Sequence, residues 1–142
     1  MIRKFKIDEL ETVMKIWVET NIAAHDFIME DYWQGNYEMV KKMLPDATIF
    51  VYEENNAILG FIGLMENYIA GIFIDANSQS KGIGKALLDY VKKRYSELLL
   101  QVYKKNSRAV RFYLREDFVV INEKTDENTS ETELIMNWIK LV

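Results

Sequence analysis

The middle of the chain changes from helical to strand-like periodicity, and this change constrains the fold more than any other feature. Three apolar runs follow one another, at 48–53, 58–65 and 68–75. Runs of this length, separated by short polar breaks, are typical of an antiparallel meander. An amphipathic segment at 82–95 then leads to another strand-like run at 98–103. A strand, a helix and a strand in this order predict a right-handed crossover, and therefore one parallel pair in the sheet.

The rest of the chain adds three strands and three helices. Further strands are expected at 2–6, 118–122 and 133–139. Further helices are expected from Asp8, which with Glu11 fits a capping box, and over 30–44 and 106–115. We therefore expect a single α+β domain over residues 1–142, with a mixed, mostly antiparallel sheet of about seven strands flanked by about four helices.

Composition excludes several classes of function. The net charge is −4 and there is no basic tail, which argues against binding to nucleic acid or to an anionic membrane surface. The absence of cysteine excludes disulfides, thiolate metal sites and cysteine nucleophiles, and one histidine leaves no imidazole-rich site, so no metal is expected. No run approaches the ~18 apolar residues of a membrane helix, and the N-terminus lacks a signal sequence, so we expect a cytoplasmic protein.

The turn that enters the helix at 82–95 is the segment most suggestive of chemistry. Gly82 and Gly84 open this helix, and Lys81 and Lys85 flank them. A helix N-terminus has unpaired N–H groups and partial positive charge, and glycine lets an anion approach the backbone. The turn therefore predicts a phosphate or pyrophosphate site, although a glycine pair at such a junction also serves packing alone.

Neither common phosphate motif fits this turn. A dinucleotide fingerprint needs a third glycine where Leu87 stands, and a Walker A loop needs serine or threonine where Ala86 stands. The remaining pattern is Gln79-x-x-Gly82-x-Gly84. It resembles the acetyl-coenzyme A loop of GNAT-type N-acetyltransferases, in which Arg/Gln-x-x-Gly-x-Gly/Ala follows a buried strand.

A second block strengthens this resemblance. Asn106, Ala109, Phe112 and Tyr113 match the family pattern Asn-x-x-Ala-x-x-Phe-Tyr after a strand. The resemblance covers nearly the whole chain, and the expected order of elements agrees with it. It implies a GNAT-like fold with a splayed central strand pair, and transfer of an acetyl group from acetyl-CoA, as cosubstrate, to a primary amine by direct attack. Asp117 departs from the family, which commonly has glycine there in a left-handed turn.

The resemblance also implies where the coenzyme binds. Its pyrophosphate would lie on the amides of Lys81, Gly82, Ile83 and Gly84, next to Gln79 and Lys85. The pantetheine arm would pair with the strand backbone around Phe73, Ile74 and Asp75, and an amide of Phe73 or Ile74 would face the thioester oxygen. Asn106 would contact the coenzyme from the start of the next helix.

Tyr113 is the expected catalytic residue. It lies seven residues after Asn106, on the same helix face, so both can serve one ligand. A phenol with a reference pKa near ~10 is protonated at neutral pH and can give a proton to the departing thiolate. Helical spacing alone favours a packed core aromatic at this position. The resemblance implies the catalytic role.

The acceptor side is less defined by the sequence. Candidate substrate-binding residues are His25 and Phe27 in the irregular segment 21–29, then Tyr32, Glu66 and Tyr68. Candidate bases are Glu66, Asp26 and Asp31, each of which also fits a solvated carboxylate. His25 is a further candidate base, and it also fits a hydrogen-bonded scaffold residue. The acceptor class stays open between a protein lysine, a peptide N-terminus and a small amine, and the oligomeric state between monomer and homodimer. An alternative function is a coenzyme A-binding sensor of the same fold without turnover.

Overall fold

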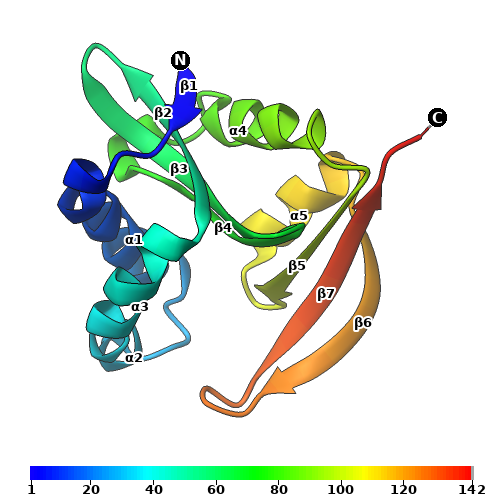
Figure 1. Ribbon diagram of the computed structural model, residues 1–142. Coiled ribbons are helices and arrows are strands. Elements are labelled where there is room, and N and C mark those ends of the chain that lie inside the picture. The colour runs from blue at the N-terminus through cyan, green and yellow to red at the C-terminus, as the bar shows by residue number, and fades with distance from the viewer. Residues whose placement is uncertain (142) are drawn as a thin grey trace.

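A sheet of seven strands separates two groups of helices in the computed structural model, which describes residues 1–141 (Figure 1). The strands are β1 (Ile2–Lys4), β2 (Thr48–Glu54), β3 (Ala57–Met65), β4 (Tyr68–Ile74), β5 (Glu97–Tyr103), β6 (Val119–Asp126) and β7 (Glu131–Ile139). The helices are α1 (Leu10–Ala24), α2 (Glu30–Gly35), α3 (Tyr37–Met43), α4 (Ile83–Lys92) and α5 (Ser107–Arg115). The expected α+β architecture is confirmed, with five α-helices in place of about four. Within residues 1–141, no helix has both the length and the apolarity needed to cross a membrane.

The strands lie in the order β1-β2-β3-β4-β5-β7-β6. The expected antiparallel meander of β2, β3 and β4 is present, and α4 makes the expected crossover to a parallel β5. The last hairpin is longer than expected, since β6 continues to Asp126 and β7 already begins at Glu131. Its additional residues are polar, so apolar periodicity did not reveal that they pair.

The two central strands, β4 and β5, pair at one end and diverge at the other (Figure 1). Their pairing joins Tyr68 to Leu99 and Ile69 to Leu100. The next residue of β4, Ala70, is an extra one, because the register against β3 shifts there. Such a bulge bends a strand away from its neighbour. The splayed strand pair implied by the family resemblance is therefore present, and the bulge is its local cause.

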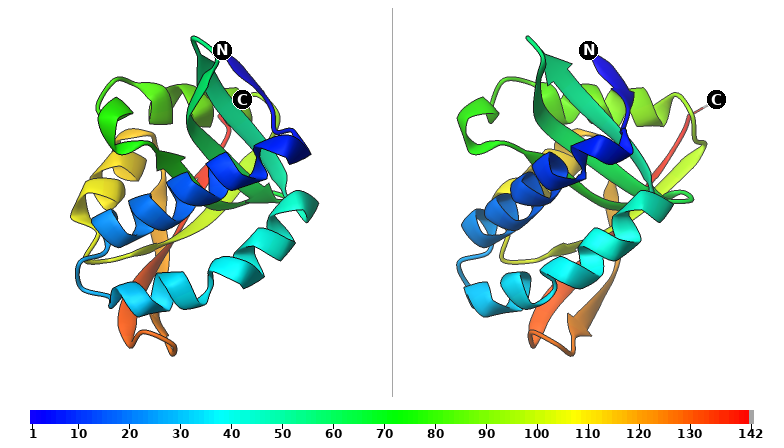
Figure 2. Two further views of the ribbon diagram at one scale, coloured as in Figure 1. Left: turned by 90° about the vertical axis from the view of Figure 1, so that its left-hand side faces the viewer. Right: turned by 60° about the vertical axis from the view of Figure 1, so that its left-hand side comes forward.

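The helices cover the two faces of the sheet as two separate groups (Figure 2), and each face carries its own apolar cluster. On one face α4 and α5 pack on the sheet, in a cluster that includes Leu87 of α4 and Leu100 of β5. On the other face α1, α2 and α3 cover it, in a cluster that includes Met14 of α1 and Phe61 of β3. Because side chains alternate along a strand, β5 sends Leu100 to the α4–α5 face and Tyr103 to the α1–α3 face.

The expected helix over 30–44 was wrong in one respect, because it is divided into α2 and α3 at Asn36. The side-chain amide of Asn36 donates to the carbonyl of Tyr32 at 2.6 Å. Glycine and asparagine, as in the pair Gly35–Asn36, have low helix propensity. The break follows from this pair and from the competing side-chain hydrogen bond.

The bounds of α1 also differ from the prediction. A 3₁₀ turn (Ile7–Glu9) precedes α1, and the carboxylate of Glu9 accepts the Lys6 N–H at 2.9 Å. The side chain of Glu9 therefore caps the start of this turn, whereas Asp8 and Glu11 were expected to form the capping box. At its other end α1 continues through Ala24, so only part of the segment expected to be irregular lies outside the helix.

Candidate active site

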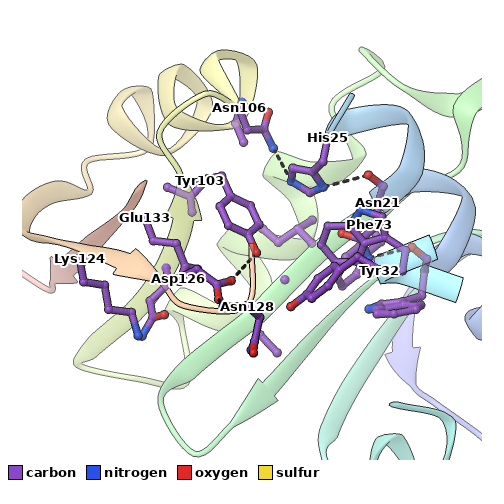
Figure 3. Close-up of a pocket in the computed structure, with 18 of the residues that line it drawn as sticks. Asn21, His25, Tyr32, Phe73, Tyr103, Asn106, Lys124, Asp126, Asn128 and Glu133 are labelled. Atoms are coloured by element: carbon purple, nitrogen blue, oxygen red, sulfur yellow. Dashed lines mark hydrogen bonds between the residues drawn. The ribbon is translucent and has the colours of Figure 1, made fainter. Parts of the chain in front are cut away.

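A cavity of about 740 Å³ lies where β4 and β5 diverge (Figure 3). Its lining comes from both strands, from α1, α2 and α5, and from the β6–β7 hairpin. Tyr113 reaches it from the α4–α5 face of the sheet, and Tyr103 and Trp33 reach it from the α1–α3 face. The cavity therefore connects the two faces through the gap between the strands, and two reactants can meet there from opposite sides.

The register of β4 determines which of its amides face this gap. The N–H of Asp75 donates to the carbonyl of Leu59 on the β3 side at 2.8 Å. Hydrogen-bonded positions alternate along an antiparallel pair. Phe73, two residues earlier, therefore also bonds toward β3, and the amides of Ile72 and Ile74 point toward β5. Of the two expected oxyanion donors, Phe73 and Ile74, only Ile74 directs its N–H into the gap. The N–H of Ile72 points the same way.

Tyr113 combines a core position with access to the cavity. Its side chain is 7% exposed and packs against Phe112 and Phe118. It also lines the cavity, and its hydroxyl has no hydrogen-bond partner within the described residues 1–141. Burial, with a smaller contribution from Tyr68, raises the pKa of Tyr113. The phenol is thus protonated at neutral pH and can donate to a group inside the cavity.

The turn before α4 has the backbone shape of an anion-binding loop. Gly82 caps α4 with a φ of 81°, and Ser80 also has a positive φ, 64°. A residue without a Cβ adopts this left-handed conformation without strain. The amides of Ile83 and Gly84 stand in the first turn of α4, where they have no acceptor within the helix. These N–H groups are available to a ligand anion.

Gln79 and Arg108 hold this loop in place. The side-chain nitrogen of Gln79 donates to the carbonyl of Ile74 at 3.1 Å. Arg108 on α5 donates to the side-chain oxygen of Gln79 and to Oγ of Ser80, each at 2.8 Å. Gln79 thus orders the loop through its side chain. Arg108 was missed by sequence reasoning, because only the fold brings the start of α5 next to this loop.

The two lysines beside the loop differ in their surroundings. Lys85 forms ion pairs with Glu116 at 3.0 Å and with Asp89 at 3.4 Å. Lys81 is exposed and forms no ion pair within residues 1–141. Lys81 therefore offers an uncompensated positive charge next to the loop, whereas the charge of Lys85 is largely balanced by the two carboxylates.

His25 links the end of α1 to the start of α5 (Figure 3). Its Nδ1 lies 2.9 Å from the carbonyl oxygen of Asn21, so Nδ1–H donates and Nε2 accepts from Nδ2 of Asn106 at 3.3 Å. Oδ1 of Asn106 in turn accepts the N–H of Ala109, which caps α5. Burial lowers the pKa of His25, whose ring also stacks on Trp33. His25 is therefore a neutral scaffold group, and both ends of the Asn106 amide are engaged.

The β6–β7 hairpin and Tyr103 form the cavity mouth on the α1–α3 face (Figure 3). The Tyr103 hydroxyl donates to Oδ2 of Asp126 at 2.6 Å, and the Asn128 N–H donates to Oδ1 at 2.9 Å. Burial disfavours the ionised Asp126, but these hydrogen bonds outweigh burial and hold its pKa below the ordinary value. Glu133 pairs with Tyr103 across β5 and β7 and lines the same cavity. Burial and the charge of Asp126 raise the pKa of Glu133.

Only some of the residues that were expected to bind the acceptor line the cavity. His25, Tyr32 and Tyr68 line the cavity. Phe27 packs edge-on against His25 and is not part of the lining. Glu66 lies at the exposed β3–β4 turn with a φ of 57°, outside the cavity.

The carboxylates that line the cavity were missed by sequence reasoning. The candidate bases Glu66, Asp26 and Asp31 are all exposed and lie outside the lining. The lining instead contains Asp126, Glu127 and Glu133. They belong to a hairpin of ordinary polar alternation, and no local pattern marks them as different from surface carboxylates.

Sequence comparison agrees with this geometry. Residues 20–132 match the family described as Acetyltransferase (GNAT) domain. Peptidyl-lysine N-acetyltransferase YiaC of Escherichia coli (strain K12) is 34% identical over an aligned length of 140 residues, and the alignment covers 97% of this chain and 96% of that protein. Peptidyl-lysine N-acetyltransferase YjaB of the same organism is 27% identical over 137 residues, 96% of this chain and 93% of that protein.

Structural comparison gives the same result. The solution structure of apo-form YjaB from Escherichia coli is similar with a TM-score of 0.87 and 26% identity, covering 99% of this chain and 98% of that one. The structure of YncA from Salmonella typhimurium with acetyl-CoA shares the fold, with a TM-score of 0.67 and 14% identity over 98% of this chain and 92% of that one. The sequence motifs, the splayed β4–β5 pair and these similarities together show that the chain belongs to the GNAT acetyltransferase family and is an acyltransferase.

Proposed function

We propose that the protein transfers the acetyl group of acetyl-CoA to the ε-amine of a lysine in a protein or peptide. One observation carries this proposal: one cavity is lined by residues from both faces of the sheet, and the buried residue Tyr113 is among them. YiaC and YjaB are named peptidyl-lysine N-acetyltransferases, which favours lysine over a peptide N-terminus or a small amine.

The α4–α5 side of the cavity supports binding of acetyl-CoA. The pyrophosphate would accept hydrogen bonds from the amides of the loop, which are those of Lys81, Gly82, Ile83 and Gly84. The ammonium of Lys81 and the guanidinium of Arg108 add positive charge beside them. From this loop the pantetheine arm would run along the free edge of β4, adding to it as a short strand would. Asn106, in contrast, would meet the coenzyme only by giving up a hydrogen bond to His25 or Ala109.

The thioester would then lie in the gap between β4 and β5. Negative charge develops on its carbonyl oxygen as the amine attacks, and the N–H of Ile72 or Ile74 would donate to that oxygen. The C–S bond breaks next, and Tyr113 would protonate the departing thiolate. Its raised pKa keeps the proton on the phenol until the thiolate forms.

The opposite mouth of the cavity suits a cationic acceptor. The rings of Tyr32 and Tyr103 border a passage for an aliphatic side chain, and Asp126 is held ionised beside them. Aromatic faces and carboxylates both attract an ammonium group. The net charge of −4 would favour approach of a basic peptide.

The test is a transfer assay with three acceptors. The purified protein is mixed with acetyl-CoA and a peptide that has a blocked N-terminus and one lysine, and the products are read by mass spectrometry and by release of free thiol. The matched acceptors are a peptide with a free N-terminus and norleucine in place of lysine, and a small diamine. Transfer to the lysine peptide alone supports the proposal. Transfer only to the other two would assign a different acceptor, and coenzyme binding without any transfer would indicate a sensor.

A further inference from the structure

Attack by a lysine requires removal of a proton from its ammonium group, and three carboxylates lie on the cavity wall. They are Asp126, Glu127 and Glu133. Asp126 already accepts hydrogen bonds on both oxygens, from Tyr103 and from the Asn128 N–H, and these favour its ionised form. A carboxylate stabilised in this way is a weak base. Glu127 is exposed in the hairpin turn, where its carboxylate is solvated.

Glu133 differs from both. It is half-buried and makes no hydrogen bond or ion pair with any residue between 1 and 141. Its neighbour Leu134 packs on the α4–α5 face, so alternation sends the side chain of Glu133 to the α1–α3 face, where the acceptor would enter. The groups facing it are Asp126 and Lys124 on β6, Tyr103 on β5 and Tyr68 on β4.

Glu133 and Tyr113 reach the same cavity from opposite faces of the sheet. Tyr68 lines the same cavity. Burial and the charge of Glu133 raise the pKa of Tyr68, and Tyr68 itself contributes to the raised pKa of Tyr113. Tyr113 is 7% exposed as a residue, and its hydroxyl makes no hydrogen bond within the described residues.

We propose that Glu133 is the general base that removes a proton from the acceptor ammonium, paired across the β4–β5 gap with Tyr113 as general acid. This inference rests on the proposed transfer to lysine. Burial and the charge of Asp126 make the Glu133 carboxylate a stronger base than an exposed one, and the charge of Lys124 acts in the opposite direction. The acid and the base then occupy the two sides from which thiolate and amine approach the carbonyl carbon.

The proton balance of the step is complete. Glu133 takes one proton from the ammonium, and the neutral amine forms a C–N bond to the thioester carbon. The C–S bond breaks, the thiolate takes the proton of Tyr113, and the resulting phenolate recovers the second proton lost by the nitrogen. Glu133 releases its proton to solvent. The products are an amide, free coenzyme A and one proton in solution.

The experiment compares the wild-type protein with Glu133→Gln, using the lysine peptide as acceptor. We expect kcat to fall about 100-fold near pH 7, the scale of a lost general base. We expect KM for the peptide and affinity for acetyl-CoA to change only a few-fold. The defect should shrink as the pH approaches that at which lysine ionises by itself, and with a peptide in which γ-thialysine, a less basic amine, replaces lysine. Glu133→Asp keeps a carboxylate and should retain more kcat than Glu133→Gln.

Glu123→Gln is the matched control, because Glu123 lies on the same hairpin, is exposed and is not part of the cavity lining. It makes the same change of net charge and should retain wild-type kcat. An unchanged kcat in Glu133→Gln, a rise in KM alone, or a defect that is equal at every pH and with both acceptors would overturn the role of Glu133. If the wild-type protein acetylates no lysine peptide, the proposed function fails and the base assignment fails with it.

Discussion

The hydroxyl of Tyr103 donates to Oδ2 of Asp126 across 2.6 Å and ties β5 to the end of β6. The two residues are far apart in the sequence and become neighbours because β7 lies between β5 and β6 and curves with them. This hydrogen bond keeps one carboxylate at the cavity mouth ionised. Glu133, on the intervening strand, makes no such hydrogen bond within the described residues.

Replacing Tyr103 by phenylalanine should raise the pKa of Asp126. The hydrogen bond favours the ionised carboxylate and burial favours the neutral one. Without the Tyr103 hydroxyl, only the remaining hydrogen bonds of Asp126 oppose the effect of burial. A hydrogen bond to a charged group contributes ~1.5–3 kcal/mol, and partial exposure of Asp126 reduces this to about 1 kcal/mol at pH 7. Because the pKa of Asp126 is lowered by folding, this stabilisation exists above the unfolded pKa and is lost as the pH falls through the folded one. Carbon NMR titration measures the pKa of Asp126, and urea unfolding at several pH values measures the loss of stability. An unchanged pKa of Asp126 in the variant would contradict the prediction.

The fold could be predicted from the sequence because its determinants are local. The apolar runs, the short turns and the strand–helix–strand order fix β2 to β5 and α4 without reference to distant residues. The break at Asn36 was harder to predict, since Gly35 and Asn36 only lower the stability of a helix that still matches the apolar period. Glu9, which caps the 3₁₀ turn before α1, is also held by the guanidinium of Arg3 on β1, and a local pattern does not show such a contact.

The candidate site was predictable on one side only. The side that we propose for the coenzyme is a helix N-terminus with glycines, and a single segment of sequence contains it. The side that we propose for the acceptor is assembled from Tyr32, Tyr103, Asp126 and Glu133, which come from four different elements. Their side chains carry no pattern that distinguishes them before β5, β6 and β7 are placed side by side. Of the two predicted oxyanion donors, Phe73 and Ile74, the strand register directs only the N–H of Ile74 toward the gap, and it directs the N–H of Ile72 there as well.

Tyr113→Phe should lower kcat at least ~100-fold while leaving acetyl-CoA affinity within a few-fold of wild type. The substitution removes only a hydroxyl that has no partner within residues 1–141, so the packing against Phe118 is kept. Steady-state kinetics and calorimetric titration with acetyl-CoA provide the two readings. Tyr90→Phe is the control, because it removes a phenolic hydroxyl from α4, outside the cavity lining. An unchanged kcat in Tyr113→Phe would remove Tyr113 from the mechanism.

Gly82→Val should weaken acetyl-CoA binding at least ~10-fold, because the loop amides would turn from their present orientation. An added Cβ meets no atom within 4 Å at Gly82, but the φ of 81° is strained for a branched residue. Left-handed backbone costs about 1–2 kcal/mol per residue for ordinary L-amino acids, so some loss of thermal stability should accompany the change. In Gly35→Ala, at a position with equally open space and no positive φ, stability should rise slightly and binding should stay unchanged. Wild-type affinity in Gly82→Val, measured by titration calorimetry, would rule out the loop as the pyrophosphate site.

His25→Phe should destabilise the protein by about 1–3 kcal/mol at pH 7, because it leaves the Asn21 carbonyl and the Asn106 amide without their ring partner. The phenyl ring keeps the stacking on Trp33, so the loss reports the hydrogen bonds. Burial lowers the pKa of His25 in the folded protein below its unfolded value of ~6.5. At a pH between these two pKa values, the unfolded chain therefore binds the proton more tightly than the folded protein does. The wild-type free energy of unfolding therefore falls as the pH is lowered from 7 to 5. His25 is the single histidine of the chain, so the variant lacks this contribution and the difference between the two proteins should narrow. Urea unfolding at pH 7, 6 and 5 tests this, and a constant difference would mean that His25 does not change its protonation on unfolding.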